Sequence, residues 1–317
     1  MTRQILFFEK FSELVIQKLQ RASFDPISSD SLRQISPEAV FGIFLKVSTK
    51  LDSKTLNLYP NLKAIVIPAT GTDLIDLRHV NEKKIDLISL RNHRETIGNF
   101  SSTTEVFLWL MISVLRNTFA GANDVIEGNW NRDAHIGTNI KGKKLGILGY
   151  GRIGRQIGSI AATMGMRVYF FDKNEFQESD NDSIKLNSAE ELFEVSDVIS
   201  INVDSDESNR SLVNSTILRR RAGRGLYLIN TSRGFIVDEV AIIDAFSAGN
   251  LIGYAADVLV GEGEQTSWLA SNPLWKANQK SQYNIVITPH LGGATRENIE
   301  ISEQVVLETF LRKYKSR

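Results

Sequence analysis

Short runs of apolar residues alternate with segments of helical periodicity along most of this 317-residue chain. The runs are apolar at consecutive positions, which is typical of strands buried on both faces of a parallel sheet. Between them, apolar residues recur with the spacing of an amphipathic helix. The alternation predicts an α/β protein with parallel sheets covered by helices.

The pattern falls into two series, and 317 residues are long for one hydrophobic core, so we expect two domains. Residues 1–101 with 291–317 are expected to form one domain, and residues 102–290 a second one inserted into it. The tail at 296–314 is helical in pattern and is expected to fold back on the first domain. The first series predicts strands at 5–8, 40–45, 62–68 and 84–90, and helices at 11–19 and from about residue 52 to just before Pro60.

The second series begins at Lys144. Before it, hydroxyl and acidic residues at 102–105 precede the apolar run 106–115, which predicts the start of a buried helix. Residues 121–143 are polar and punctuated by glycine, and we interpret them as an arm that leads to the next strand. The second series predicts strands at 145–148, 168–171, 198–203, 226–230, 253–258 and 285–288, and helices at 155–164, 188–194, 215–222 and 238–248.

A glycine turn joins the first strand and helix of this series. Gly149, Gly151 and Gly154 form G-x-G-x-x-G, and Asp172 ends the next strand 18 positions after Gly154. The first glycine permits a tight turn, the second leaves room for a pyrophosphate, and the third lets the helix pack on the strand. A carboxylate at the position of Asp172 suits the ribose hydroxyl groups. The pattern predicts a dinucleotide site, with a purely structural turn as the alternative.

Composition narrows the function classes. Basic and acidic residues balance at 37 each, which indicates neither a nucleic-acid binder nor a polybasic membrane anchor. The absence of cysteine excludes disulfides and thiol nucleophiles and fits a reducing compartment. The apolar run near the N-terminus is too short for a signal peptide, and the run 106–115 is too short to cross a bilayer. We expect a soluble cytoplasmic protein with no nucleic-acid or membrane partner.

Arg233 is the first candidate for chemistry at a strand end, where the carboxyl edge of a doubly wound sheet lines its ligand crevice. It follows an apolar strand within Asn230-Thr231-Ser232-Arg233-Gly234. A cation there needs an anionic partner, and its planar guanidinium suits a carboxylate. A structural ion pair is the alternative, and the sequence alone leaves both open.

Two further strand ends carry candidates. Asp257 lies within the end of the strand at 253–258, where a buried carboxylate needs donors such as a ligand amide. Glu262 lies in the loop beyond, where a solvated carboxylate is the alternative. His290 alone among the four histidines ends an apolar run, and acid–base chemistry near neutral pH usually uses histidine. A structural histidine is the alternative. The histidines show no ligand spacing, so we expect no metal.

These segments, taken in chain order, resemble the NAD-dependent D-isomer-specific 2-hydroxyacid dehydrogenases. The resemblance rests on the glycine turn, Asp172, the segment 230–234, Asp257 with Glu262 five positions later, and Thr-Pro-His-x-Gly-Gly-Ala-Thr at 288–295. It extends to 128–143 and to Gly-Thr-Asp-Leu-Ile-Asp at 71–76, and so covers most of the chain.

The resemblance implies two Rossmann-like or flavodoxin-like domains with parallel sheets, the dinucleotide-binding domain inserted into the substrate domain, and a homodimer. It implies hydride transfer between NAD(H) and a small 2-hydroxy or 2-keto acid. Arg233 would hold the substrate carboxylate, and His290 would be the acid/base paired to Glu262. The implied cofactor-binding residues are Gly149, Tyr150, Gly151, Arg152, Ile153, Gly154, Asp172, Asn202, Val203, Thr231, Ser232, Asp257, His290 and Gly292. The implied substrate-binding residues are Val47, Ser48, Thr70, Gly71, Arg233 and His290.

Two departures from the family pattern bear on function. Asn202-Val203-Asp204 stands where the family usually has His-x-Pro, on the cofactor-lining wall, and Ser48 stands where many relatives have arginine, which argues against a phosphorylated substrate. Two alternatives stay open: an NAD(H)-sensing binding protein or co-regulator of the same fold, and a dehydrogenase of another small acid such as phosphite. Glu262 argues against the formate type, which usually has glutamine there.

Overall fold

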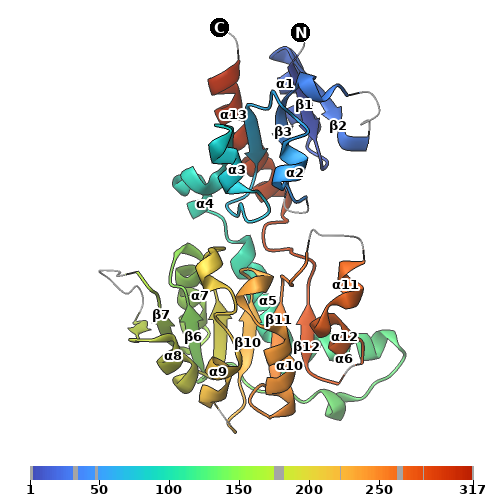
Figure 1. The fold of residues 1–317 in the computed structure, drawn as a ribbon. Helices are drawn as coiled ribbons and strands as arrows, with labels where there is room; N and C mark the ends of the chain where they lie inside the picture. The colour runs from blue at the N-terminus through green and yellow to red at the C-terminus, as the bar shows by residue number, and fades with distance from the viewer. Residues whose placement is uncertain are drawn as a thin grey trace. The chain divides into compact units, whose positions relative to one another are not determined.

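The computed structural model describes residues 3–30, 35–46, 49–174, 182–221, 223–262, 267–280 and 282–315. The chain divides into two compact units. Of the described residues, 3–100 and 294–315 form unit 1, and 101–262 and 267–293 form unit 2. Each unit contains one sheet with helices on it (Figure 1).

Unit 1 has a five-stranded sheet in the order β2-β1-β3-β4-β5, and every neighbouring pair is parallel. This is the flavodoxin-like order of a doubly wound sheet. The strands are β1 (Arg3–Phe7), β2 (Phe24–Ser28), β3 (Val40–Phe44), β4 (Ala64–Ile67) and β5 (Asp86–Ser89). The helices are α1 (Glu13–Arg21), η2 (Pro37–Ala39), α2 (Ser53–Leu56), α3 (Leu77–Glu82), η3 (Leu90–Asn92), α4 (Arg94–Gly98) and α13 (Arg296–Tyr314).

Alternate residues of these strands enter two hydrophobic cores, one on each face. On one face, Ile5 and Val66 pack with α1 and with Phe310 of α13. On the other, Ile43 and Ile65 pack with α2 and α3. The tail helix α13, whose helical periodicity is visible in the sequence, therefore packs on the sheet of unit 1.

Strand β2 is missing from the prediction. Its sequence contains Pro26, and proline is confined to edge strands because it donates no ladder hydrogen bond. In the structure β2 is the edge of the sheet and pairs with β1 alone. Because Pro26 interrupts this short run, the apolar pattern did not predict the edge strand.

Unit 2 has a seven-stranded sheet in the order β12-β11-β10-β9-β6-β7-β8, again with every neighbouring pair parallel. The order reverses between β6 and β9, and this switch point is where a Rossmann sheet binds its ligand. The strands are β6 (Lys144–Leu148), β7 (Arg167–Phe171), β8 (Ile184–Lys185), β9 (Val198–Ile201), β10 (Tyr227–Asn230), β11 (Gly253–Ala256) and β12 (Ile285–Ile287). The helices are α5 (Ser102–Arg116), α6 (Thr118–Ile126), η4 (Arg132–His135), α7 (Arg152–Thr163), α8 (Ala189–Val195), η5 (Glu207–Asn209), α9 (Ser215–Leu218), η6 (Arg219–Arg221), η7 (Gly234–Ile236), α10 (Glu239–Ser247), α11 (Trp268–Ser271) and α12 (Pro273–Gln279).

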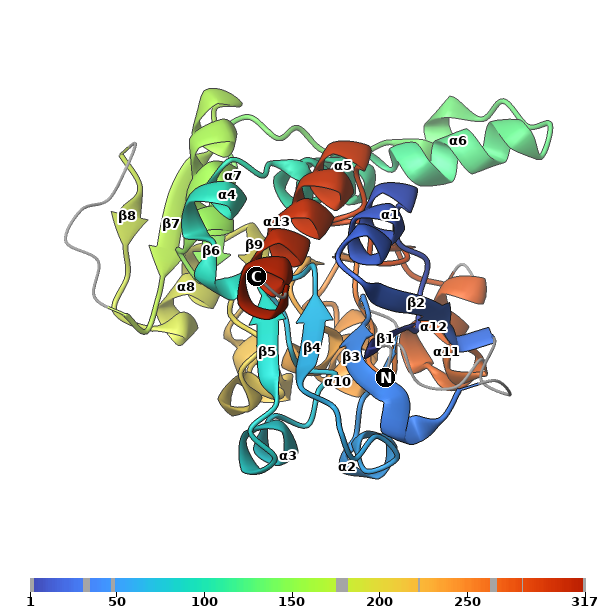
Figure 2. The same ribbon diagram turned by 90° about the horizontal axis from the view of Figure 1, so that it is seen from above.

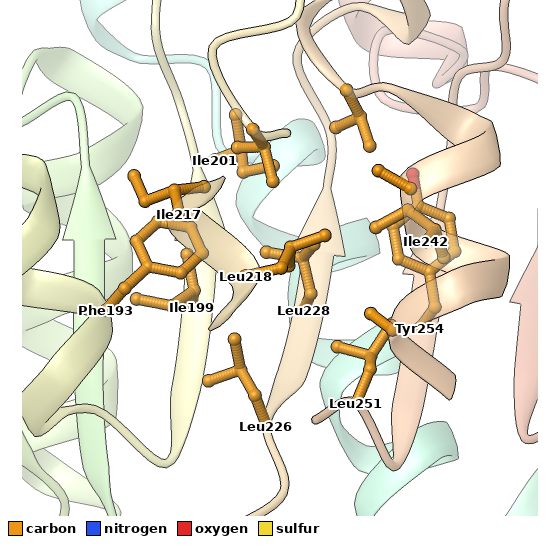
Figure 3. Close-up of a cluster of buried hydrophobic side chains, with 14 of the residues drawn as sticks. Phe193, Ile199, Ile201, Ile217, Leu218, Leu226, Leu228, Ile242, Leu251 and Tyr254 are labelled. Carbon is orange, nitrogen blue, oxygen red and sulfur yellow. The ribbon is translucent and has the colours of Figure 1, made fainter. Parts of the chain in front are cut away.

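Both faces of this sheet are buried, as the continuous apolar runs predict. One core joins α5 and α7 to strand residues such as Ile147 and Ile229. The other joins α8, α9 and α10 to Ile199, Leu228 and Tyr254, and Figure 3 shows these side chains packed together. The α/β fold with two parallel sheets is thus confirmed.

The expected arm at 121–143 contains two helices that the pattern did not reveal, most of α6 and all of η4. No residue of α6 is buried, so it lacks the apolar-in, polar-out contrast that identifies a packed helix. Figure 2 shows α5 and α6 as separate helices. Asn117 separates them with a left-handed φ of 52°. In the described part of the chain, none of the helices is long and apolar enough to span a membrane.

Candidate active site

Three glycines shape the turn between β6 and α7. Gly149 has a φ of +94°, and a Cβ there would lie 2.7 Å from the carbonyl group of Asn202. A Cβ on Gly154 would lie 2.3 Å from the Gly149 carbonyl oxygen, so helix and turn are in close contact. A Cβ on Gly151 would meet nothing within 4 Å. The turn thus leaves an open face at the N-terminus of α7, an arrangement that suits a phosphate.

Arg152 and Ile153 begin α7 beside that open face. Burial lowers the pKa of Arg152, yet an arginine side chain stays charged at any physiological pH. Ile153 is half-buried and packs against the core under α7. The start of α7 therefore offers a phosphate the positive charge of Arg152 as well as backbone N–H groups.

Asp172 follows β7 and is tied to the same turn. Its Oδ2 accepts a hydrogen bond from the backbone N–H of Tyr150 at 2.8 Å, and its Oδ1 accepts from the backbone and side chain of Asn174 at 2.8 and 3.0 Å. The Tyr150 ring is fully buried, stacks on Phe170 and donates to Ser183, so its side chain belongs to the core. The result is a carboxylate fixed next to the glycine turn, as ribose recognition requires.

Two buried polar atoms at neighbouring strand ends have no hydrogen-bond partner within the described ranges. They are Oδ1 of Asn202, after β9, and Oγ1 of Thr231, after β10. Leaving such a group unsatisfied costs about 1–3 kcal/mol, so both suit a polar ligand. Between them, the Ser232 hydroxyl donates to the Val203 carbonyl and joins the two strand ends. With the open face at Gly151, these atoms fit a dinucleotide along the carboxyl edge of the sheet.

Arg233 lies in a turn that buried Asn230 holds. The Asn230 amide donates to the Arg233 carbonyl at 2.9 Å and accepts from the Ser232 N–H at 3.0 Å. The half-buried Arg233 side chain donates through Nη1 to the Ser232 carbonyl at 2.8 Å. A Cβ on Gly234 would lie 2.1 Å from the Leu259 carbonyl carbon, so this turn packs directly on the segment after β11.

Asp257 follows β11 and organises the loop after β12. The residue is 1% exposed, and its carboxylate accepts from the Thr288 hydroxyl at 2.6 Å and from the Leu291 and Gly292 N–H groups at 2.7 Å each. Burial raises the pKa of Asp257, and these hydrogen bonds oppose that shift. The expected contact with a nicotinamide amide stays a prediction; what Asp257 does here is fix the loop that carries His290.

His290 has a left-handed backbone, with a φ of +54°, and its N–H donates to the Asp257 carbonyl at 2.8 Å. Its Nδ1 lies 3.0 Å from Oε1 of Glu262, and both side chains are about a quarter exposed, at 23% and 24%. The two atoms are within ion-pair distance, but their geometry is not that of an aligned hydrogen bond. A non-glycine residue held in this conformation is a common feature of functional sites.

Arg233, Glu262 and His290 therefore come from the carboxyl ends of three adjacent strands of unit 2, β10, β11 and β12. Thr70 and Gly71 follow β4 in unit 1, where Thr70 is exposed and Gly71 half-buried. Val47 and Ser48 lie outside the described residues. In the described parts of the chain, no group of three His, Asp or Glu residues could hold a metal ion.

Sequence reasoning missed two residues at this edge, Glu239 and Asn272, whose buried side chains contact the segment leading to Glu262. Glu239 follows Asp238 at a predicted helix start, where an acidic residue is ordinary, and Asn272 precedes a proline, where asparagine commonly caps a helix. Neither position carries a signal of its own in the sequence.

Comparison with known proteins agrees with this geometry. Residues 108–292 match the family model described as D-isomer specific 2-hydroxyacid dehydrogenase, NAD binding domain. The chain is 30% identical over 302 residues to D-3-phosphoglycerate dehydrogenase of Haemophilus influenzae, covering 93% of this chain and 70% of the relative. It is 29% identical over 312 residues to the Bacillus subtilis enzyme of that name, covering 96% of this chain but only 56% of the relative.

Solved structures share the fold over nearly the whole chain. The TT0316 protein from Thermus thermophilus superimposes with a TM-score of 0.80 at 26% identity, covering 97% of this chain and 96% of that one. D-Lactate dehydrogenase from Aquifex aeolicus, complexed with NAD and lactic acid, superimposes with a TM-score of 0.81 at 22% identity, covering 98% and 95%.

Proposed function

Because the chain belongs to the D-isomer specific 2-hydroxyacid dehydrogenase family and carries its NAD-binding domain, we propose that it interconverts a small 2-keto acid and the 2-hydroxy acid with NAD(H). When bound, the nicotinamide supplies or accepts the hydride. The residues of the chain bind both molecules, exclude water and move the proton.

The observation that carries the proposal is the contact between His290 and Glu262. Reduction of a keto acid needs a proton donor, and an adjacent carboxylate stabilises the charged imidazolium. Since Nδ1 faces Glu262, the proton passes through Nε2. The hydrogen bonds that Asp257 makes with the loop keep the imidazole at this strand end.

Arg233 is assigned to the substrate carboxylate. Its guanidinium is planar and offers paired donors that match a carboxylate in both shape and charge. The backbone of its turn is fixed by Asn230 and by the contact of Gly234 with Leu259. Such a preformed turn reduces the ordering needed when substrate binds.

The cofactor is assigned to the edge formed by the glycine turn, Asp172, Asn202 and Thr231. The helix start after Gly151 takes the pyrophosphate, and Asp172 takes the adenosine ribose hydroxyls. The buried Asn202 and Thr231 oxygens then complete their hydrogen bonds with the cofactor. His290 and Gly292, in the loop after β12, are assigned to the same edge.

Unit 1 is proposed as the substrate domain, with Val47, Ser48, Thr70 and Gly71 offering backbone N–H groups to the substrate carboxylate. Because relatives are named D-3-phosphoglycerate dehydrogenase, phosphorylated and unphosphorylated acids must both be considered as substrates. Because Ser48 offers no cation to a phosphate, we propose an unphosphorylated substrate.

The test is a panel of 2-keto acids assayed by NADH oxidation. It includes glyoxylate, pyruvate, hydroxypyruvate and 3-phosphohydroxypyruvate, with formate and phosphite assayed by NAD reduction. We expect turnover of an unphosphorylated keto acid. A preference for the phosphorylated acid would contradict the substrate assignment, and NADH binding without turnover of any member would favour the sensor alternative.

We also propose that the protein is a homodimer that associates through α6 and its flanks. No residue of α6 is buried. Large apolar side chains are exposed on this helix and on the segments next to it: Trp109, Phe119, Val125, Ile126, Trp130 and Ile136. Light scattering should give a dimer mass for the parent, and Ile126→Asp should lower it. A monomeric parent would contradict this assignment.

A further inference from the structure

Glu239 is a buried carboxylate at the first turn of α10 that the proposed reaction does not use. It is 7% exposed, and each of its oxygens accepts one hydrogen bond. Oε1 accepts from the backbone N–H of Val260 at 2.8 Å, and Oε2 accepts from the side-chain amide of Asn272 at 2.7 Å. Val260 lies two positions before Glu262, so Glu239 holds the segment that carries the partner of His290.

The orientation of Asn272 is fixed by a second set of contacts. Its Oδ1 caps α12 by accepting from the N–H groups of Leu274 and Trp275 at 3.0 and 3.1 Å. Its Nδ2 must therefore face the other way, where it donates to Glu239 and, at 3.3 Å, to the Val260 carbonyl. Both backbone polar groups of Val260 are thus held by side chains, and Glu239 must accept at both oxygens.

Packing restrains the same segment from the other side. The carbonyl carbon of Leu259 lies so close to Gly234 that a Cβ there would be 2.1 Å from it. Leu259 is itself buried. After Val260 the chain turns through Gly261, with a φ of +90°, into Glu262. Val260 is therefore the last residue of this segment fixed by buried side chains before the catalytic carboxylate.

We propose that Glu239, together with Asn272, is a positioning residue that holds Glu262 against His290. The inference rests on the proposed role of the His290–Glu262 pair. Loss of the Glu239 contacts frees the Val260 peptide, so Glu262 spends less time at ion-pair distance and the imidazolium loses part of its stabilisation. A residue that acts only on folding would instead lower stability and leave the protonation of His290 unchanged.

Few charged or titratable groups lie near Glu239 among the described residues. Burial raises the pKa of Glu239, its hydrogen bonds with Val260 and Asn272 oppose this, and Asp238 on the same helix adds to it. Tyr254 approaches from β11, where burial raises the pKa of its phenol strongly. His290, in the loop after β12, faces Glu262 directly and also interacts with Asp257, which follows β11. The effect of Glu239 on His290 therefore passes through Glu262.

The test follows the imidazole of His290 by NMR during a pH titration of the cofactor-free protein. With four histidines in the chain, His290→Asn identifies the signal. Glu262→Gln should move the titration midpoint to lower pH, because it removes the negative charge beside Nδ1. Glu239→Gln should move it in the same direction by a smaller amount, because glutamine has one carbonyl oxygen for two donors. The double variant should equal Glu262→Gln, because the two changes act through one contact.

Asp124→Asn is the matched control, because Asp124 pairs with His135 at 3.1 Å with similar exposure. It should leave the His290 midpoint at the parent value. If Glu239→Gln does not fold, Asn272→Ser decides, since serine keeps the helix cap but cannot reach Glu239 with an amide donor.

The inference requires that Glu262→Gln moves the midpoint. If it does, a parent-like midpoint in Glu239→Gln would overturn the inference. Where Glu239→Gln does not fold, a parent-like midpoint in Asn272→Ser would overturn it instead. An unchanged midpoint in Glu262→Gln would instead overturn the proposed pair itself. Since the titration needs no substrate, neither result depends on which keto acid the enzyme reduces.

Discussion

Glu262→Gln in the active enzyme gives the sharpest kinetic prediction. It removes one charge 3.0 Å from His290 Nδ1 and keeps a hydrogen-bonding side chain of the same size. Unit charges at about 3–4 Å interact by about 1–5 kcal/mol for effective dielectric constants of about 80–20, and exposed pairs measure about 0.2–1 kcal/mol. Because the side chains are a quarter exposed, we take an interaction of about 1–2 kcal/mol between the two groups, which is roughly 5- to 30-fold in an equilibrium constant.

The assay measures kcat/KM for keto-acid reduction from about pH 5 to about pH 10 in buffers of matched ionic strength. Reduction needs the imidazolium, so the alkaline fall in activity should begin at lower pH in Glu262→Gln. On that alkaline limb kcat/KM should be roughly 5- to 30-fold below the parent, with activity at acid pH largely kept. Asp124→Asn, which breaks the similar pair with His135, should give the parent profile. Superimposable profiles for Glu262→Gln and the parent would refute the role of Glu262.

Three further predictions follow from other contacts. Arg233→Ala should lower kcat/KM for the keto acid by roughly 10- to 150-fold, equivalent to about 1.5–3 kcal/mol, with NADH affinity unchanged; parent kinetics would make the arginine structural. Asp172 should favour NADH over NADPH, measured by fluorescence titration of both, because its carboxylate repels a 2′-phosphate; equal affinities would contradict this. Asp86 is partly buried, yet hydrogen bonds from Lys313 and Tyr314 hold its pKa below the ordinary value, so the stability it contributes is present above the unfolded pKa and lost as pH falls. Urea unfolding of Asp86→Asn should therefore show a deficit at pH 7 that vanishes toward about pH 3.

The features that could be predicted from the sequence are those that local chemistry imposes. The tight turn at Gly149 needs a positive φ, and Gly154 must lack a Cβ to pack on the turn. The glycine spacing, together with the flanking strand and helix and Asp172, therefore indicates the dinucleotide edge. The buried sheets required uninterrupted apolar runs, which is why their strands were predicted. The contact of His290 with Glu262 also agrees with the prediction, although their catalytic roles stay proposals.

The features that could not be predicted depend on contacts between distant segments. The hydrogen bonds of Asp257 to the loop at 288–292 exist only once β11 and β12 lie side by side, and its contact with a nicotinamide amide stays a prediction. Glu239 reaches Val260 and Asn272 across 21 and 33 positions of sequence. No periodicity or spacing records such pairings, since each residue also suits a plain helix terminus.

The central claim is that His290 transfers the proton in a keto-acid reduction that uses NADH. The most direct measurement compares the parent with His290→Asn, because asparagine tolerates the left-handed backbone at this position better than most residues do. NADH affinity and NADH oxidation by the best keto acid of the panel are measured in parallel. We predict that His290→Asn binds NADH as the parent does and loses at least about 100-fold in turnover. Turnover equal to that of the parent would contradict the account.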